Sequence, residues 1–272
     1  MSSKALIITV APNGAYKTKE QHPQVPLTAA ELAVTAKQCL DAGAAMIHMH
    51  IRKPDGSHLL DAHTYKEATQ AVRQAVGQEL VVQITSEAAQ VYQPHVQMQV
   101  VRDSEPEAVS IGLREIVRPD VPQADVQAFF SWLKQQQVMT QIILYDTADV
   151  QTWQSLRASG IIDDAPWFLL FVLGRYSAGQ VSAPTDLLPF LHAHDNAYPW
   201  AMCAFGPQEH ACATAAATLG GHVRVGFENN LYLKDGSLAP DNAALVTQVA
   251  QAAEGLAMPL ATAADVRELF TP

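Results

Sequence analysis

Two histidines two residues apart, His48 and His50, occupy the stretch MIHMHIRKPDG at residues 46–56. Residues 46–51 are apolar enough to form a buried strand, and histidine is an uncommon choice for packing inside one. Side chains two apart along a strand face the same side, so the two imidazoles should point together. Either this is chance, with one ring bonded in the core and the other near the surface, or both rings hold a ligand in a cavity.

A carboxylate far along the chain could complete such a site. The stretch RVGFENN places Arg224, Gly226 and Glu228 on one face of a predicted strand, with Glu228 at the C-terminal end. Two imidazoles and one carboxylate form a competent three-ligand Zn²⁺ site with an open position for substrate. Other divalent ions use the same donors, so the residues alone leave the identity of the metal open.

The elements that must position these residues alternate between strand and helix. Strand-like runs cover residues 6–11, 46–51, 80–85, 108–111, 141–145, 167–173, 200–204 and 222–227. Helix-like segments cover residues 27–40, 63–76, 96–101, 123–136, 150–158, 186–191, 209–219 and 242–256. Eight alternations over 272 residues predict an α/β fold, a (β/α)8 TIM barrel forming a single domain over residues 1–272. A doubly wound open sheet is the alternative, weakened by the lack of G-x-G-x-x-G after the first strand.

A closed barrel would bring the candidate ligands together. Its second and eighth strands both flank the first, and barrel active sites lie at the C-terminal ends of the strands. His48 and His50 are near the end of the second strand, and Glu228 is at the end of the eighth. The barrel therefore predicts a metal centre formed by these three side chains.

The overall composition disfavours several classes of function. The formal net charge of −10 and the lack of a basic cluster argue against nucleic acid and anionic membranes as partners. With no run of 18 apolar residues and no signal-peptide pattern, we expect a cytoplasmic protein. The three cysteines, Cys39, Cys203 and Cys212, form no C-x-x-C motif, which fits a reducing compartment.

Several motifs together resemble a known family. In chain order they are IITVAPNG, KTKEQHPQVPLTAAELA, AGAAMIHMHIRKPDG, FVLG, GGHVRVGFENN and NAALV. They resemble the β-keto acid cleavage enzymes, whose best-known members act on 3-keto-5-aminohexanoate. The resemblance implies a (β/α)8 barrel with one zinc per subunit, bound by His48, His50 and Glu228, in a homotetramer.

The resemblance also implies a reaction. The family's enzymes are transferases that condense a β-keto acid with the co-substrate acetyl-CoA and cleave the product to acetoacetate and a new acyl-CoA. Arg224 matches the family's arginine and could neutralise a carboxylate, although a structural ion pair inside the barrel is an alternative. A CoA-independent metal-dependent lyase or hydrolase and a non-catalytic metal-binding barrel are the competing hypotheses.

One departure from the family pattern concerns the catalytic base. Asn229 stands where the family has an aspartate linked to proton abstraction, and an amide is not a base at neutral pH. Glu87 and Glu115, each just past the C-terminal end of a strand, are candidate replacements, or else solvated loop carboxylates. We expect Arg224, Glu87 and Asn229 to be the catalytic residues.

Two further departures concern the substrate. Tyr16 stands where the best-known members carry a glutamate, and Thr85-Ser86-Glu87-Ala88 replaces their S-T-G-G. Without acidic groups at positions 16 and 229, we expect a neutral or anionic tail rather than a cationic amine on the keto acid. The expected substrate-binding residues are Asn13, Tyr16, Arg52, Thr85 and Ser86. Arg52 could instead form a salt bridge with Asp55 or Asp61.

Overall fold

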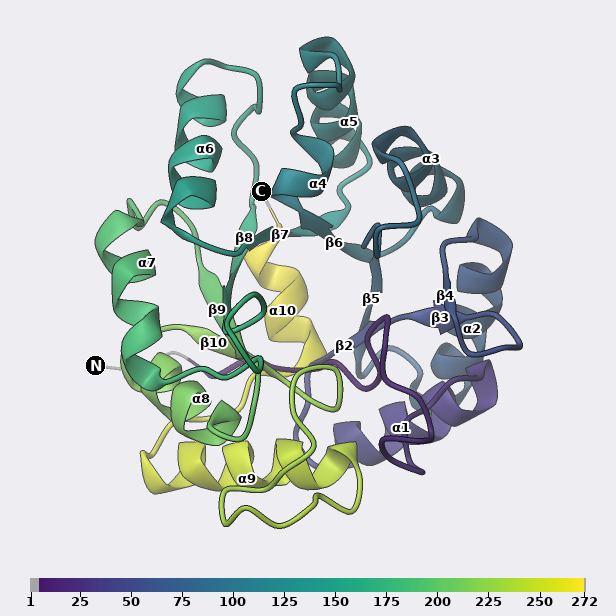
Figure 1. The fold of residues 1–272 in the computed structure, drawn as a ribbon, viewed down its shortest axis with the longest axis vertical. Helices are drawn as coiled ribbons and strands as arrows, with labels where there is room; N and C mark the ends of the chain where they lie inside the picture. Colours follow the sequence, from purple (N-terminus) through teal and green to yellow (C-terminus); the bar gives the residue numbers. More distant parts are fainter. Residues whose placement is uncertain (1–4, 272) are drawn as a thin grey trace.

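A computed structural model describes residues 5–271, in which eight parallel strands form a closed barrel (Figure 1). The strands are β1 (Ile8–Val10), β2 (Met46–Met49), β5 (Val81–Thr85), β6 (Ala108–Gly112), β7 (Met139–Leu144), β8 (Phe168–Leu173), β9 (Trp200–Ala204) and β10 (His222–Val225). Each strand pairs with the next of this series, and β10 pairs with β1 to close the barrel. The predicted TIM-barrel fold is therefore confirmed.

Helices form a ring around the barrel (Figure 1). They are α1 (Ala29–Asp41), α2 (Ala62–Val76), α3 (Pro94–Ser104), α5 (Gln123–Gln135), α6 (Thr147–Ala158), α7 (Leu188–Ala193), α8 (Glu209–Thr218) and α9 (Asn242–Gly255). Two short elements, α4 (Leu113–Ile116) and the 3-10 turn η1 (Pro184–Leu187), lie in the connections. Thr28 and Glu31 start α1 with the reciprocal hydrogen bonds of a capping box. Among residues 5–271, no helix has both the length and the apolar character needed to span a bilayer.

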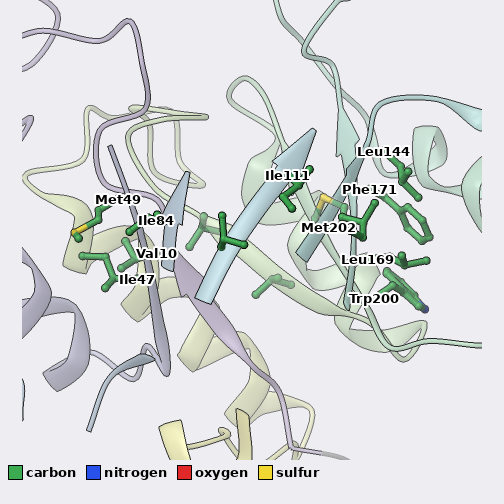
Figure 2. Close-up of a cluster of buried hydrophobic side chains, with 14 of the residues drawn as sticks. Val10, Ile47, Met49, Ile84, Ile111, Leu144, Leu169, Phe171, Trp200 and Met202 are labelled. Carbon is green, nitrogen blue, oxygen red and sulfur yellow. The ribbon is translucent and has the colours of Figure 1, made fainter. Parts of the chain in front are cut away.

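The strands are buried on both faces because helices cover the outside and side chains fill the inside. Figure 2 shows outward-facing residues such as Val10, Ile47, Ile84 and Phe171 in the apolar layer between strands and helices. The alternate residues point into the barrel, and several of them are polar and fully buried. They include Thr9, His48, Gln83, Ser110, Gln141 and Arg224. The barrel interior is therefore where polar groups can act together.

A helix that the sequence analysis did not predict, α10 (Ala263–Leu269), lies inside the ring of helices (Figure 1). Its residues Ala263 and Val266 pack against side chains at the N-terminal ends of the strands, among them Ile7, Met46 and Val81. This apolar layer closes that end of the barrel. Ligands must therefore enter at the opposite end, where the strands terminate.

The two strands that carry the candidate ligands end earlier than predicted. β2 stops at Met49, and the backbone N–H of His50 donates to Asn13 Oδ1 at 3.2 Å. The chain then forms a small antiparallel ribbon of β3 (Ile51–Arg52) and β4 (His58–Leu59). β10 stops at Val225 because Gly226 has φ +139° and lies against the Ala11 carbonyl. Glu228 is therefore in a turn after the strand rather than at its end.

Candidate metal centre

His48, His50 and Glu228 converge at the C-terminal end of the barrel. The Nε2 atoms of the two histidines are 3.1 Å apart, and each lies 3.6 Å from Glu228 Oε2. The three candidate ligand atoms lie within 4.8 Å of one another. The two rings come from β2 and the residue following it, and the carboxylate comes from the turn after β10. The structure thus brings together three side chains whose positions span 180 residues of sequence.

The protonation of these groups suits a metal. Burial lowers the pKa of His48 to about 4 and that of His50 well below its ordinary value, so both rings are neutral near pH 7. His48 Nδ1 lies 2.9 Å from Gln83 Oε1, which leaves Nε2 as the free donor atom. Glu228 Oε2 is buried and has no hydrogen-bond partner within residues 5–271. Neutral imidazoles and an unpaired carboxylate oxygen at one point are what a divalent cation needs.

Arg224 keeps the Glu228 carboxylate charged. Burial alone would raise the pKa of Glu228, but the Arg224 guanidinium, helped by the more distant charges of Arg175 and Lys17, outweighs burial and holds it below its ordinary value. Arg224 Nη2 lies 3.3 Å from Glu228 Oε1 and 3.6 Å from Cys203 Sγ. The Arg224 Nε and Nη1 groups are buried without a hydrogen-bond partner in the described chain. The ion pair inside the barrel, one of the two alternatives for Arg224, is thus present beside His48, His50 and Glu228, the candidate metal-ligand group.

Gly14 makes room for Glu228. It has φ +60°, and a Cβ atom at this position would lie 2.6 Å from Glu228 Cγ. A side chain here would be strained by the backbone and would also displace the carboxylate. Gly56 has a similar backbone, with φ +82°, but a Cβ there would meet nothing within 4 Å.

Gly14→Ala is therefore expected to weaken metal binding about tenfold or more and to lower stability by roughly 1–3 kcal/mol. Gly56→Ala should cost stability through its backbone alone and leave metal affinity unchanged. Metal competition against a chromogenic chelator and thermal unfolding measure the two effects. Equal metal affinity in the two variants would show that the Gly14 contact does not position Glu228.

A buried carboxyl group, Glu209, holds the turn that carries Glu228. Glu209 is the first residue of α8 and is fully buried. Its Oε1 accepts from the Gly226 backbone N–H at 3.1 Å, and its Oε2 accepts from Asn230 Nδ2 at 3.3 Å. Burial raises the pKa of Glu209 to about 8, more than these hydrogen bonds lower it. The group is an unusual internal acid directly behind the metal-ligand turn.

The raised pKa of Glu209 predicts a pH dependence of stability. The unfolded chain has the ordinary pKa of about 4.5, and the folded chain has about 8. Ionisation is thus disfavoured in the folded state, so stability is highest below pH 4.5 for this group and falls as pH rises towards 8. Glu209→Gln should remove this fall, which we expect to be on the order of 3 kcal/mol between pH 5 and 8. Urea unfolding of the metal-free proteins, with the exposed Glu254→Gln as control, measures it; parallel curves for both variants would contradict it.

A cavity of about 390 Å³ opens beside the metal-ligand group. Its lining includes the segment from Asn13 to Lys17 after β1, Glu87 after β5, Arg175 after β8, and Glu228. Glu87 Oε2 lies 3.8 Å from His50 Nε2, and Glu87 Oε1 lies 3.4 Å from Arg175 Nη2. Burial, together with the nearby Glu228 charge, raises the pKa of Glu87 to about 8. Glu87 is therefore a carboxyl group able to exchange a proton with a molecule in the cavity.

The two candidate bases differ in their surroundings. Glu115 Oε2 accepts from the Ala88 backbone N–H at 2.9 Å and from Gln97 Nε2 at 2.8 Å. These bonds tie Glu115 to the loop after β5, and it is not among the residues that line the cavity. Glu87 faces the cavity, whereas Glu115 supports the loop that carries it.

The hydroxyl groups of the predicted pair, Thr85 and Ser86, form hydrogen bonds that hold the loop after β5. Thr85 Oγ1 accepts from the Glu87 backbone N–H at 3.0 Å, and Ser86 Oγ donates to the Ser110 carbonyl at 3.0 Å. Both residues are buried. Their hydroxyls shape the turn that presents Glu87.

The other predicted binding residues lie around the loop after β1. Asn13 lines the cavity, and its side chain joins this loop to the backbone of His50 through both Nδ2 and Oδ1. Tyr16 lines the cavity mouth and is 51% exposed. Arg52 donates to backbone carbonyls of Asn13, Gly14, Lys17 and Gly56.

The aspartates proposed as alternative partners for Arg52 have other contacts. Asp55 accepts from Ser57, and Asp61 accepts from Thr64 at the start of α2. The guanidinium instead ties the loop after β1 to the ribbon formed by β3 and β4. Asn229 is buried, with Nδ2 3.5 Å from the Arg224 carbonyl and Oδ1 unpartnered within residues 5–271.

Four residues at the site were given no role from sequence: Lys17, Gln83, Arg175 and Glu209. Gln83 had a usable signal, because it is two residues before Thr85 on a strand and so faces the barrel interior. Arg175 lies two residues after a predicted strand, which places it at the mouth but indicates no partner. Lys17 and Glu209 carry no local pattern that separates them from surface residues.

The fold and the site define a barrel enzyme with a candidate metal centre where its strands end. Residues 5–271 match the family model of the beta-keto acid cleavage enzymes, so the chain belongs to this family and is an enzyme of this type. It is 28% identical over 268 residues to the 3-keto-5-aminohexanoate cleavage enzyme of Acetoanaerobium sticklandii, with 97% of each chain covered. The predicted family is thereby confirmed.

Two further similarities extend the comparison. The chain is 27% identical over 271 residues to the 3-oxoadipate:acetyl-CoA acetyltransferase of Cupriavidus necator, covering 97% of this chain and 94% of the relative. A ternary complex of ObcA with a C4-CoA adduct and oxalate superposes with a TM-score of 0.72 at 16% identity. That alignment covers 91% of this chain and 67% of ObcA, and it supports the fold.

Proposed function

We propose that the enzyme condenses a β-keto acid with acetyl-CoA and cleaves the product to acetoacetate and a new acyl-CoA. The observation that carries the proposal is the convergence of His48, His50 and Glu228 beside a cavity that also contains Glu87. The family match and a relative named for its use of acetyl-CoA support it. The overall exchange converts R–CO–CH2–COO⁻ and CH3–CO–S-CoA into CH3–CO–CH2–COO⁻ and R–CO–S-CoA.

We infer that the metal is zinc, held by His48, His50 and Glu228. Two histidines and one glutamate with an open position form a known donor set for catalytic zinc. When bound, a divalent metal acts as a Lewis acid that polarises a carbonyl oxygen and stabilises negative charge developing there. Gln83 orients His48, and Arg224 keeps Glu228 ionised, so the chain maintains the donors in the form that binds a cation.

Glu87 is the proposed base in place of the family's aspartate. It takes a proton from C2 of the keto acid, and the resulting carbanion attacks the acetyl carbonyl and expels the CoA thiolate. The thiolate then attacks the original ketone carbon, and the bond between C2 and that carbon breaks. The electron pair returns to C2, which recovers the proton from Glu87. A base with a pKa near the working pH suits both proton transfers.

The remaining predicted residues have proposed supporting roles. Arg224 supplies positive charge beside the reacting groups, and Asn229 offers its unpartnered carbonyl oxygen as a hydrogen-bond acceptor. Asn13 and Tyr16 line the cavity and are proposed to contact the substrate. Thr85, Ser86 and Arg52 are proposed to act by shaping the loops that form the cavity.

A CoA-coupled screen tests the proposal. The protein is incubated with acetyl-CoA and β-keto acids that differ in the charge of their tails, and new acyl-CoA is detected by mass. We expect product from a neutral or anionic keto acid, none without acetyl-CoA, and none after chelation. Turnover without acetyl-CoA would point to a lyase or hydrolase. Absence of product from every keto acid, with one metal bound per chain, would contradict the proposal.

Three features stay predictions with direct tests. We propose a homotetramer, as the family resemblance implies, and light scattering of the purified protein measures it. We propose a single domain, for which one cooperative unfolding transition is expected. We also propose a cytoplasmic location, which fractionation of the source cells can check.

A further inference from the structure

Arg175 occupies a fixed position in the wall of the cavity. Its guanidinium carbon lies 5.0 Å from the centre of the Tyr16 ring and 5.2 Å from that of Phe205. Two aromatic rings thus contact the planar group and limit its movement. Glu87 Oε1, at 3.4 Å from Nη2, is its carboxylate neighbour. Arg175 is a pre-positioned cation rather than a mobile surface side chain.

Lys17 is a second cation in the same wall. It lines the cavity and is partly buried. Within residues 5–271, no carboxylate lies at salt-bridge distance from its ammonium group. Lys19, two residues along, is instead paired with Glu31 at 2.8 Å. A partly buried ammonium without a partner is costly unless a ligand supplies the opposite charge.

The charges that line the cavity do not balance without a ligand. Glu228 is committed to Arg224 and to the group of candidate metal ligands, and Glu87 is the one other carboxylate among the cavity-lining residues. Glu87 contacts Arg175 through Nη2, at 3.4 Å, and the wall therefore holds one cation more than its remaining carboxylates can offset. A β-keto acid brings one carboxylate, which the reacting centre requires. The surplus cation, together with Arg175, therefore calls for a second anionic group.

Several other groups at the mouth are polar. Gln90, Gln180 and the hydroxyl-bearing rings of Tyr16 and Tyr176 line it, beside the apolar side chains of Ala15 and Phe205. An apolar tail would leave these amides and both cations poorly solvated, and a cationic amine would be repelled by Arg175 and Lys17. A carboxylate can accept hydrogen bonds from all of these groups.

We propose that Arg175 and Lys17 bind a second carboxylate on the keto acid, so that the substrate is a β-keto dicarboxylate. This inference rests on the proposed function and narrows its neutral-or-anionic tail to an anionic one. Arg175 is the main specificity-determining residue, because its planar donor pair can bind a carboxylate with two parallel hydrogen bonds. The same cations could meet the phosphates of acetyl-CoA, and the experiment separates these two sources of anion.

The test compares two acids of equal length, 3-oxoadipate and 3-oxohexanoate, which differ by a terminal carboxylate. We expect the wild type to prefer 3-oxoadipate by at least about 50-fold in kcat/KM, since charge-assisted hydrogen bonds are the strong ones. Arg175→Met should lower kcat/KM for 3-oxoadipate about 100-fold more than kcat/KM for 3-oxohexanoate, and Lys17→Met about tenfold more. Lys37→Met, which removes a lysine from the outer helix α1, is the matched control and should leave the preference intact.

The decisive readout is the ratio of the kcat/KM values for the two acids, because any effect of Arg175 on Glu87 changes both values alike. A raised KM for acetyl-CoA with an unchanged ratio would assign the two cations to CoA phosphates and overturn the inference. A wild-type preference for 3-oxohexanoate would overturn it too.

A binding measurement keeps this test separate from turnover. Calorimetric titration of the metal-loaded protein with 3-oxoadipate in the absence of acetyl-CoA should show binding that Arg175→Met weakens about 100-fold. Binding of 3-oxoadipate without turnover would contradict the proposed function but support the dicarboxylate site. Turnover of monocarboxylic acids alone would support the proposed function but contradict the dicarboxylate site. Thermal unfolding of each variant checks that it folds.

Discussion

His48→Ala is expected to abolish both metal binding and turnover. The variant removes one of three donors and leaves His50 and Glu228 with an incomplete set. We expect metal affinity to fall by about 10³-fold or more, since three protein ligands hold a catalytic zinc. Competition with a chromogenic chelator measures affinity directly, and acyl-CoA formation measures turnover. Affinity is the primary readout because it does not depend on the identity of the substrate.

His192→Ala provides the matched control for this variant. His192 is exposed on α7 and lies outside the metal-ligand group. The His192→Ala variant should bind one metal per chain with wild-type affinity and form acyl-CoA at the wild-type rate. If His48→Ala also retained one tightly bound metal, the His48, His50 and Glu228 group would not be the metal centre. Gln83→Ala should give an intermediate loss of affinity, about 10- to 100-fold, because it removes the hydrogen bond that orients His48.

Glu87→Gln is expected to have the second large effect, a fall in kcat of about 10³-fold with little change in KM. Glutamine keeps the size of the side chain but cannot accept the proton from C2, and general bases typically contribute 10²–10⁴-fold. The metal should remain bound, because Glu87 is outside the group of three ligands. Steady-state kinetics with both substrates varied, together with metal analysis, checks the three expectations.

Comparing Glu115→Gln with Glu87→Gln shows which of the two glutamates acts as the base and which one supports the loop. The bonds of Glu115 to Ala88 and Gln97 hold the loop, so Glu115→Gln should change kcat less than about fivefold. A larger loss in Glu115→Gln than in Glu87→Gln would reverse the assignment. The double variant Glu87→Gln with Asn229→Asp tests whether an aspartate at position 229, as in the family, can act as the base. Full activity in Glu87→Gln would show that Glu87 is not the base.

Much of the architecture could be predicted because it depends on local patterns. Apolar runs bounded by glycines and polar helices repeat eight times, and such alternation is compatible with few folds. The helix expected over residues 27–40 is present as α1, which begins at Ala29 after the capping box of Thr28 and Glu31. His48 and His50 share a face because strand side chains alternate, whatever surrounds the strand. α10 was missed because its short apolar stretch near the C-terminus has no repeating partner in the sequence.

The sequence by itself determined the barrel, the family and the three side chains most suited to a metal. Only the tertiary structure decided which glutamate faces the cavity, because Glu87 and Glu115 both follow a strand and differ only in the groups that contact them. It alone paired Arg175 with Glu87, which are 88 residues apart, and placed Lys17 in the same wall. The physical reason is that burial, pKa and charge balance depend on every element packed around a group. Strand periodicity depends on the backbone of that strand alone.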